Sequence, residues 1–304
     1  MARILLNDGL DAAAVQALRG KGHDVDTAHY EGGELDAQLQ GADAVVIRSA
    51  TKLREPNLQA ALETGRLKLI IRGGVGIDNI DHVFARAHGM EVRNTPTASS
   101  ASVAELALAH MFAISRYIAH ANVTLRQGEW NKKQYKGVEL GGATLGIVGI
   151  GRIGQELGRR ALALGMSVLY TDLPGVAWEN AGAARVELDE LLARCDYISL
   201  HVPFDKAKGA LIGAAQFAQM KEGVRLVNCS RGGVVDEAAL LAALESGKVA
   251  GAGIDVFAEE PTKNLALLCH PNVSATPHIG AETKQAQQRV GAEVVDILSE
   301  RLGG

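Results

Sequence analysis

The sequence predicts an α/β fold built from two doubly wound parallel sheets. Two observations carry this prediction: short apolar runs alternate with helical patterns along nearly the whole chain, and one apolar run breaks into glycines just before a helix begins. At 304 residues the chain is also longer than one hydrophobic core usually supports. We therefore expect two domains, each built around its own sheet.

The first part of the chain alternates strand and helix patterns. We expect strands over residues 3–7, 23–27, 43–48, 67–72 and 90–93, separated by helices such as Asp11–Arg19 and Pro56–Glu63. A helical pattern then runs from Ser99 to Gln127 with no strand inside it. This long segment predicts a helical connector between the two sheets.

The second part of the chain repeats the alternation and predicts a six-stranded sheet. Its strands are expected over residues 143–149, 167–171, 196–202, 224–229, 249–254 and 272–275. A final helix, Glu282–Leu298, is expected to pack back on the first domain. The predicted domains are therefore residues 95–279 and residues 1–94 together with 280–304.

A glycine-rich turn predicts a dinucleotide site. The strand that begins at Thr144 ends in glycines at positions 149, 151 and 154, and a helix follows. Such a turn places backbone N–H groups and the positive end of a helix dipole against a pyrophosphate. Asp172 follows 18 residues after Gly154, at the end of the next apolar run, where an acidic residue binds the adenosine ribose. Leu173 and Pro174 offer no cation to a 2′-phosphate, so the pattern favours NAD over NADP.

The composition of the chain argues against membrane-spanning and nucleic-acid-binding proteins. Hydrophobic residues make up 47% of the chain, yet no run approaches the roughly 20 apolar residues of a membrane span. The N-terminus turns polar after a few residues, which predicts a cytoplasmic protein. A net charge of −4 and a pI near 6.2 predict neither a nucleic-acid nor a membrane partner. Three widely spaced cysteines, Cys195, Cys229 and Cys269, predict no metal site.

Three candidates for acid–base chemistry and anion binding follow apolar strands. Arg231 precedes two glycines and carries the planar guanidinium that suits a carboxylate, although a solvated loop arginine is the ordinary alternative. His278 follows a strand and a proline; taken alone, a histidine there is more often a core or surface residue. Glu260 precedes Pro261, and a turn carboxylate is its alternative. If Glu260 approached His278, it would stabilise the protonated imidazole and form an acid–base pair.

At these motifs the chain resembles the D-isomer-specific 2-hydroxyacid dehydrogenase family, and within it the members that act on 3-phosphoglycerate. The resemblance covers the whole chain through ordered blocks: R-S-A-T-K-L at 48–53, R-G-G-V-G-I-D-N-I-D at 72–81, N-T-P-T-A-S-S-A-S-V-A-E-L at 94–106, the glycine turn, H-V-P at 201–203, N-C-S-R-G-G-V-V-D-E at 228–237, D-V-F-A-E-E-P at 255–261 and P-H-I-G-A at 277–281. It implies a Rossmann-type NAD-binding domain inserted in a flavodoxin-like substrate domain.

The resemblance also implies residue roles. Arg231 would bind and polarise the substrate, Glu260 would orient His278, and His278 would exchange the hydroxyl proton. The NAD contacts implied are Val75, Gly149, Gly151, Arg152, Ile153, Gly154, Asp172, His201, Val202, Pro203, Cys229, Ser230, Arg231, Asp255, His278, Gly280 and Ala281; the substrate contacts are Arg48, Ser49, Gly73, Gly74, Val75, Arg231 and His278. For Cys229, a small apolar filler is the alternative.

Substrate choice depends on fewer residues. Arg48 and Ser49 stand in the loop that, in the resembled members, contacts a phosphorylated substrate, so a phosphorylated 2-hydroxy acid of serine synthesis is expected. Lys132, Lys133 and Lys136 are either a solvated face or a partner subunit's contribution. A reductase of glyoxylate or hydroxypyruvate, and an NAD(H)-sensing corepressor-like module, remain alternatives. The resemblance further implies a homodimer through the connector helix, and a short form without a serine-regulated C-terminal domain.

Overall fold

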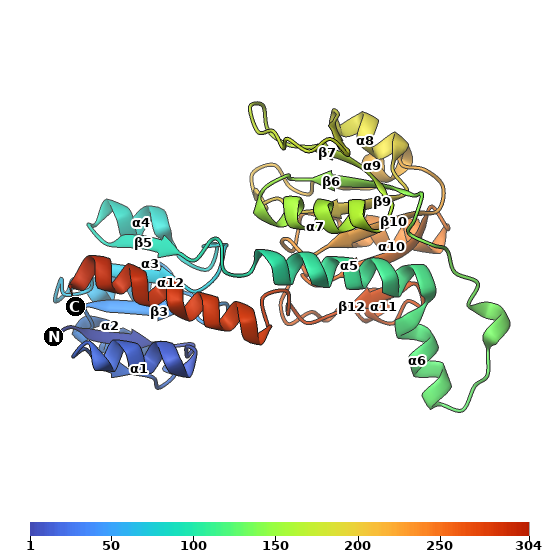
Figure 1. Cartoon of the computed structure of the whole chain (residues 1–304). Helices are drawn as coiled ribbons and strands as arrows, with labels where there is room; N and C mark the ends of the chain where they lie inside the picture. The colour runs from blue at the N-terminus through green and yellow to red at the C-terminus, as the bar shows by residue number, and fades with distance from the viewer. Residues whose placement is uncertain (304) are drawn as a thin grey trace. The chain divides into compact units, whose positions relative to one another are not determined.

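The computed structural model describes residues 1–303. By its internal contacts the chain divides into two compact units, Met1–Ser99 together with the residues from Ala281 on, and Ser100–Gly280. The sequence placed the divisions at residues 95 and 279. Figure 1 shows the elements of each unit, which are taken one unit at a time below.

The first unit holds a five-stranded, wholly parallel sheet. Its strand order is β2-β1-β3-β4-β5, the flavodoxin-like order, as expected. The strands are β1 (Arg3–Leu6), β2 (Asp24–Asp26), β3 (Ala44–Ile47), β4 (Leu69–Arg72) and β5 (Glu91–Asn94). The helices are α1 (Ala12–Gly20), α2 (Gly32–Gly41), α3 (Glu55–Leu62), α4 (His82–Ala87) and α12 (Lys284–Leu302).

Two apolar clusters form the core of this unit, one containing Leu5, Val45 and Ile70 and the other Ile4, Val46 and Ile71. Alternate residues of each strand thus enter opposite clusters, because both faces of a parallel sheet are covered. The second cluster includes Val290 and Val294 of α12. The last helix therefore packs on the first unit, as the sequence predicts.

The second unit holds a seven-stranded parallel sheet of order β12-β11-β10-β9-β6-β7-β8. Its strands are β6 (Thr144–Val148), β7 (Ser167–Thr171), β8 (Ala183–Arg185), β9 (Tyr197–Leu200), β10 (Val224–Asn228), β11 (Val249–Ile254) and β12 (Val273–Ala275). The order reverses between β6 and β9, as in a Rossmann-type sheet. The α/β class with two parallel sheets is thereby confirmed.

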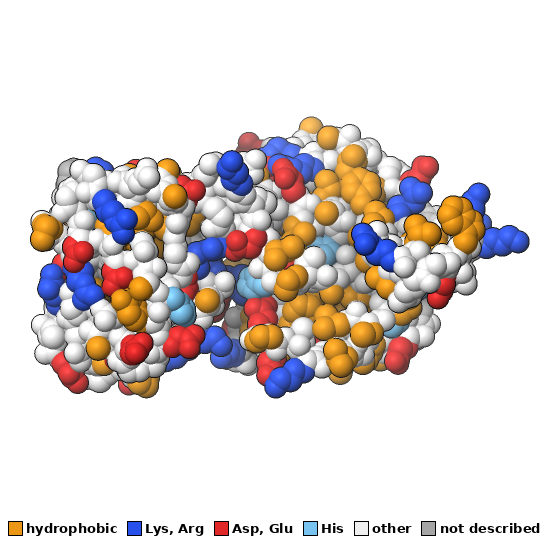
Figure 2. Space-filling model, turned by 90° about the horizontal axis from the view of Figure 1, so that it is seen from below, with side chains coloured by type: hydrophobic (Ala, Val, Ile, Leu, Met, Phe, Trp, Pro, Cys, Tyr) orange, Lys and Arg blue, Asp and Glu red, His pale blue; other side chains and the backbone are white. Residues whose placement is uncertain are grey.

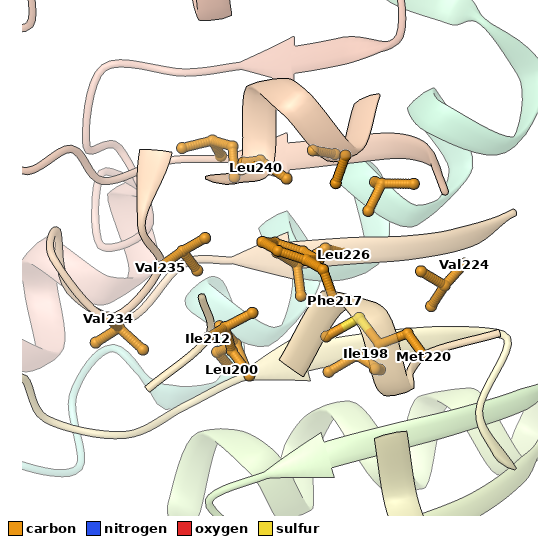
Figure 3. Close-up of a cluster of buried hydrophobic side chains, with 14 of the residues drawn as sticks. Ile198, Leu200, Ile212, Phe217, Met220, Val224, Leu226, Val234, Val235 and Leu240 are labelled. Atoms are coloured by element: carbon orange, nitrogen blue, oxygen red, sulfur yellow. The ribbon is translucent and has the colours of Figure 1, made fainter. Parts of the chain in front are cut away.

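Helices cover both faces of the second sheet (Figure 1). The helices of this unit are α5 (Ser100–Arg116), α6 (Ile118–Arg126), α7 (Arg152–Ala163), α8 (Leu188–Arg194), α9 (Ala214–Gln219), α10 (Glu237–Glu245) and α11 (Leu265–Leu268), with a 3₁₀ turn at Lys132–Gln134. Of these, α6 projects away from the sheet in Figure 1. Figure 3 shows one of the two apolar clusters, where Phe217 and Met220 lie against Ile198 and Leu226 of neighbouring strands.

Two sequence predictions for this unit were wrong. The sheet has a seventh strand, because β8 pairs with β7 at an edge through only three residues, too few for an apolar pattern. The connector is two helices, because Tyr117 adopts a left-handed conformation, φ +56°, between α5 and α6. The carbonyl of Ser115 accepts a hydrogen bond from the N–H of Val138 at 3.0 Å, so α5 ends there.

Candidate active site

The glycine turn between β6 and α7 leaves open space in front of its backbone. Gly149 has φ +94°, and a Cβ there would stand 2.4 Å from the carbonyl oxygen of His201. A Cβ on Gly154 would stand 2.3 Å from the carbonyl oxygen of Gly149. A Cβ on Gly151, in contrast, would meet nothing within 4 Å. The outer glycines are therefore required by packing, whereas Gly151 leaves room for a phosphate at the N-terminus of α7.

Asp172 lies beside this turn, directly after β7. Its Oδ2 accepts the N–H of Ile150 at 2.7 Å, and its Oδ1 accepts the N–H of Leu173 at 2.7 Å. The carboxylate predicted to bind the ribose is thus held next to the glycine turn. The guanidinium of Arg185, on β8, donates to the carbonyl oxygen of Asp172 at 3.1 Å. This cation was not predicted, because it lies 13 residues further along the chain, on the strand that the apolar pattern missed.

The open cradle and the adjoining carboxylate fit a dinucleotide. Arg152 and Ile153 open α7 at the same turn. His201, Val202 and Pro203 follow β9, the strand beside β6, and the Val202 side chain lies against Gly149. These predicted contacts thus gather at the carboxyl end of two neighbouring strands, where ligands of open α/β sheets bind.

Arg231 is presented by a tight turn after β10. The amide of Asn228 donates to the carbonyl oxygen of Arg231 at 3.0 Å, and its Oδ1 accepts the N–H of Ser230 at 3.1 Å. A Cβ on Gly232 would lie 1.7 Å from the carbonyl oxygen of Phe257, so the turn requires glycine to pack against the segment after β11. Cys229 is buried here, and burial raises the pKa of its thiol well above the usual range. That environment agrees with the filler alternative rather than a reactive thiol.

Glu260 and His278 form a hydrogen-bonded pair. The Oε2 of Glu260 lies 2.8 Å from Nδ1 of His278, and both side chains are about one third exposed, at 38% and 34%. Glu260 Oε1 accepts the N–H of Phe257 at 3.1 Å. Burial alone would raise the pKa of Glu260, but the hydrogen bond and charge of His278, the Phe257 N–H and the charge of Arg231 lower it. The three predicted catalytic side chains therefore lie near one another in one unit.

Asp255 supports the backbone around His278. Its carbonyl oxygen accepts the N–H of His278 at 2.8 Å, and its carboxylate accepts the N–H groups of Ile279 and Gly280, each at 2.9 Å. His278 has φ +56°, a conformation that a residue with a side chain adopts only when its surroundings fix it. Asp255, which was predicted as a cofactor contact, thus holds the backbone around the histidine through hydrogen bonds.

The remaining predicted residues belong to the first unit. Arg48 and Ser49 follow β3, and Gly73, Gly74 and Val75 follow the adjacent β4. Ala281 begins the segment that leads into α12, and its carbonyl oxygen accepts Gln287 Nε2 at 2.9 Å. Ser49 is exposed, and so is Val75, at 37%.

Two residues, Asp8 and Asn79, hold the backbone of the loop that begins at Arg48 through hydrogen bonds. Asp8 accepts the N–H of Arg48 at 2.6 Å and the N–H of Thr51 at 3.0 Å. The amide of Asn79 donates to the carbonyl oxygens of Arg48 and Thr51 at 2.6 and 2.7 Å. These partners come from distant parts of the sequence and were not predicted.

The side chain of Arg48 is paired with a carboxylate that the sequence did not indicate. Its guanidinium hydrogen-bonds to Glu282, whose side chain is 45% exposed. A second arginine, Arg72, ends β4 opposite Ile47 of β3 and donates to the carbonyl oxygen of Gly73 at 3.4 Å. Because Arg48 follows Ile47 directly, the carboxyl edge of this sheet carries two guanidinium groups.

Comparison with known proteins agrees with this geometry. The model of the D-isomer specific 2-hydroxyacid dehydrogenase NAD binding domain matches residues 108–280. The chain belongs to this family. It is therefore an NAD-dependent oxidoreductase, and NAD is its cofactor.

The chain is similar to relatives with different printed activities. It is 46% identical to a hydroxypyruvate reductase of Thermotoga maritima, over 99% of this chain and 98% of the relative. It is 42% identical to a D-3-phosphoglycerate dehydrogenase of Rattus norvegicus, over 96% of this chain but only 55% of that longer protein. Its structure resembles that of a D-lactate dehydrogenase from Aquifex aeolicus complexed with NAD and lactic acid, at a TM-score of 0.85 and 30% identity, covering 99% of this chain and 95% of that one.

Residues 1–303 contain no helix that is long and apolar enough to cross a membrane. The same residues bring together no group of three or more histidine, cysteine or acidic side chains suited to a metal ion.

Proposed function

We propose that the protein oxidises 3-phospho-D-glycerate to 3-phosphohydroxypyruvate with NAD, the opening step of serine biosynthesis. The observation that supports a phosphorylated substrate is the pair of arginines, Arg48 and Arg72, at the carboxyl ends of adjacent strands in the first sheet. Phosphate oxygens are bound best by such guanidinium forks. The exposed Ser49 adds a hydroxyl donor beside Arg48.

The Glu260–His278 pair supports the acid–base part of the reaction. Because Nδ1 of His278 is bonded to Glu260, Nε2 is the nitrogen that faces the substrate hydroxyl and takes its proton. Glu260 then stabilises the imidazolium, and the Arg231 guanidinium holds the carboxylate next to the reacting carbon. In the reverse direction His278 returns the proton to the carbonyl oxygen. Bound NAD supplies the hydride acceptor, held by the turn at Gly149, Gly151 and Gly154 and by Asp172.

A specific observation favours a second candidate, the reduction of hydroxypyruvate. The guanidinium of Arg48 is already bonded to Glu282, so a phosphate must compete with a carboxylate for this cation. Hydroxypyruvate lacks only the phosphate and needs no such exchange. The 46% identity to a hydroxypyruvate reductase, which the chain matches over nearly its full length, also supports this alternative.

One assay separates the two functions. Oxidation of NADH is followed with 3-phosphohydroxypyruvate, hydroxypyruvate, glyoxylate and pyruvate at equal concentration. A higher kcat/KM for the phosphorylated acid would support the first proposal. A preference for hydroxypyruvate would replace it with the second, and turnover of none of the four acids would contradict both.

We also propose that the protein forms a homodimer through α6 and the segment after it. Large apolar side chains are exposed there: Ile118, Val123 and Leu125 at 53%, 52% and 55%, and Trp130 at 81%. In Figure 2 this segment lies at the right of the view, where apolar side chains in orange stand beside lysine and arginine side chains in blue. Such an exposed apolar group is typical of a protein interface. Light scattering should give twice the mass of the chain, and Trp130→Asp should shift it toward the monomer.

A cytoplasmic location is proposed as well. The three cysteines, Cys195, Cys229 and Cys269, are all free thiols in the structure. Free cysteines are typical of a reducing compartment. Fractionation of the producing cells would test this.

A further inference from the structure

A series of hydrogen bonds, of which the first is buried and the next two are partly buried, leads from helix α5 to the segment that carries His278. The Oγ of Ser274 lies 3.0 Å from Nδ1 of His110, and the Nε2 of His110 lies 3.1 Å from Oγ1 of Thr276. Thr276 in turn donates to Oδ1 of Asp255 at 2.6 Å. His110 and Asp255 are 2% and 1% exposed. Loss of a hydrogen-bond partner of the His110 ring or of the Asp255 carboxylate therefore leaves a buried polar atom unpaired, which is costly.

The donor and the acceptor of each hydrogen bond follow from the carboxylate at which the series ends. The carboxylate of Asp255 only accepts, so the single hydroxyl hydrogen of Thr276 points to it. The Oγ1 of Thr276 must then accept from Nε2–H of His110, which leaves Nδ1 unprotonated to accept from Ser274. Burial lowers the pKa of His110 although the charge of Asp255 opposes this, which agrees with a neutral ring. Aligned bonds of this kind polarise and strengthen one another.

The series ends at the groups that fix His278. Asp255 Oδ1, which accepts from Thr276, also accepts the N–H of Ile279, and Oδ2 accepts the N–H of Gly280. Thr276 is joined to Ile254 by its own N–H at 2.9 Å. Both ends of the turn that contains His278 are therefore tied to Asp255 and its strand.

The approach of His110 to this strand depends on a glycine. A Cβ on Gly253 of β11 would stand 2.4 Å from Cβ of His110. The absence of a side chain at this position lets α5 lie close enough for the ring to reach Ser274 and Thr276. The glycine at position 253 and the packing of α5 thus place the His110 ring where both of its hydrogen bonds can form.

We propose that His110 is a positioning residue for the hydride-transfer reaction. It acts through Thr276 and Asp255 to hold the His278 turn in its left-handed conformation, so that the imidazole faces the substrate while still bonded to Glu260. This inference rests on the proposed acid–base role of His278. It adds a group on α5 that touches neither substrate nor cofactor.

The test compares a variant that removes the hydrogen bonds with one that keeps them. His110→Leu fills the space without polar atoms, whereas His110→Gln can accept from Ser274 and donate to Thr276. We expect His110→Leu to lower kcat roughly five- to tenfold, the scale of one misplaced hydrogen bond, with KM for the oxo acid changed less than about twofold. His110→Gln should restore kcat to within about twofold of the wild type. The oxo acid is whichever member of the four-acid panel the wild type reduces.

A second variant shows whether the effect passes through Thr276. If it does, Thr276→Val and the double variant His110→Leu/Thr276→Val should have the same kcat, because the hydroxyl that transmits the effect is already gone. If His110→Leu does not fold, Thr276→Val and His110→Gln carry the comparison. Ser115→Ala is the matched control: it removes a buried hydroxyl from the same helix, bonded to Tyr197 at 2.7 Å, and should lower only the melting temperature.

The outcomes are distinct. Equal kcat for the wild type, His110→Leu and Thr276→Val, with a change in Tm alone, would overturn the proposal and leave His110 a packing residue. Equal loss of kcat in His110→Leu and His110→Gln would also contradict it. His278→Ala is measured alongside. If that variant stays active, the proposed acid–base function fails first, whereas an inactive His278→Ala beside a fully active His110→Leu would refute only the role of His110.

Discussion

The Oε2 of Glu260 lies 2.8 Å from Nδ1 of His278. This contact lowers the pKa of the Glu260 carboxyl group, although burial acts to raise it. The two residues are 18 positions apart and follow different strands, β11 and β12, which pair in the sheet. The pair therefore depends on the strand order rather than on a local motif. Its charge pattern, a carboxylate behind an imidazole, is what proton exchange with a hydroxyl requires.

Replacing the histidine should stop most of the reaction. His278→Ala removes the group proposed to exchange the hydroxyl proton, and we expect kcat to fall roughly 10²- to 10⁴-fold, the usual contribution of a positioned acid or base. Steady-state oxidation of NADH measures this. A kcat equal to that of the wild type would remove His278 from the mechanism.

The neighbouring carboxylates offer a matched test of Glu260. Glu260→Gln keeps the shape of the side chain but loses the charge proposed to stabilise the imidazolium, and kcat should fall about tenfold or more. Glu259→Gln changes an exposed carboxylate whose nearest cation, Lys263, is 4.0 Å away, and should leave kcat unchanged. Because the pKa of Glu260 lies below its ordinary 4.5, the wild type keeps this charge throughout the neutral range. A loss of activity in both variants, or in neither, would contradict the assignment.

Local patterns in the sequence predicted the elements that local interactions determine. The glycine turn, Asp172 and the strands of both sheets except β8 follow from apolar periodicity and turn residues over a few positions. The catalytic candidates were predicted one at a time because each follows an apolar strand. A parallel sheet brings such strand ends to one edge, so their proximity is a consequence of the fold.

The features that were not predicted from the sequence depend on contacts between residues that are far apart in the chain. The break after Arg116 depends on the hydrogen bond between Val138 and Ser115, which a periodic helical pattern does not reveal. His110 reaches Ser274 across 164 positions, and Arg48 reaches Glu282 across 234. In the sequence His110 and Glu282 are ordinary members of two helical segments. Only the packed structure shows what each one touches.

The three glycines of the nucleotide turn should respond differently to alanine. At Gly151 the backbone has φ −66° and a Cβ meets nothing within 4 Å, so Gly151→Ala should change stability by less than about 0.5 kcal/mol. The same methyl group occupies the space expected for the pyrophosphate, and NADH affinity should fall roughly tenfold or more. Titration of NADH fluorescence and thermal unfolding separate the two effects.

Gly149→Ala is the matched comparison. Its φ of +94° costs a residue with a side chain about 1–3 kcal/mol, and the Cβ also meets the His201 carbonyl oxygen at 2.4 Å. We therefore expect this variant to be destabilised before any ligand is added. Equal melting temperatures for the two variants would contradict the account of the turn.

Asp172 should control the choice of cofactor. Asp172→Ala removes the carboxylate proposed to bind the ribose hydroxyls, so NAD affinity should fall, and the loss of negative charge should relax discrimination against NADP. Arg185, whose guanidinium donates to the Asp172 carbonyl oxygen, then offers a cation to a 2′-phosphate. Asp189→Ala, an exposed acid in the first turn of α8, is the control. Equal NAD affinity in the wild type and Asp172→Ala would refute this role.

Acid should destabilise the protein through His201. Burial lowers the pKa of this histidine from 6.5 to about 4, and its Nδ1 has no hydrogen-bond partner in the described residues. Between those values the unfolded chain binds the proton and the folded chain does not, so stability is complete above pH 6.5 and falls as the pH drops toward 4. The shift corresponds to about 3 kcal/mol.

Urea unfolding at several pH values tests this. In His201→Gln the loss of stability between pH 6.5 and 4 should be smaller than in the wild type by about that amount. His88→Gln, which changes an exposed ring bonded to the Phe84 carbonyl oxygen, should retain the wild-type dependence. An unchanged pH dependence in His201→Gln would contradict the prediction.

The Arg48–Glu282 pair should decide between phosphorylated and unphosphorylated acids. Arg48→Ala should raise KM for 3-phosphohydroxypyruvate roughly ten- to 100-fold, the value of hydrogen bonds to a charged group, and change KM for hydroxypyruvate little. Glu282→Gln should lower KM for the phosphorylated acid roughly two- to fivefold, because an exposed ion pair of modest strength no longer competes. Arg66→Ala breaks a comparable pair with Asp43 in the same unit and should alter neither KM. If Arg48→Ala and Glu282→Gln affect both acids equally, Arg48 does not bind the phosphate, and hydroxypyruvate becomes the substrate that the structure fits better.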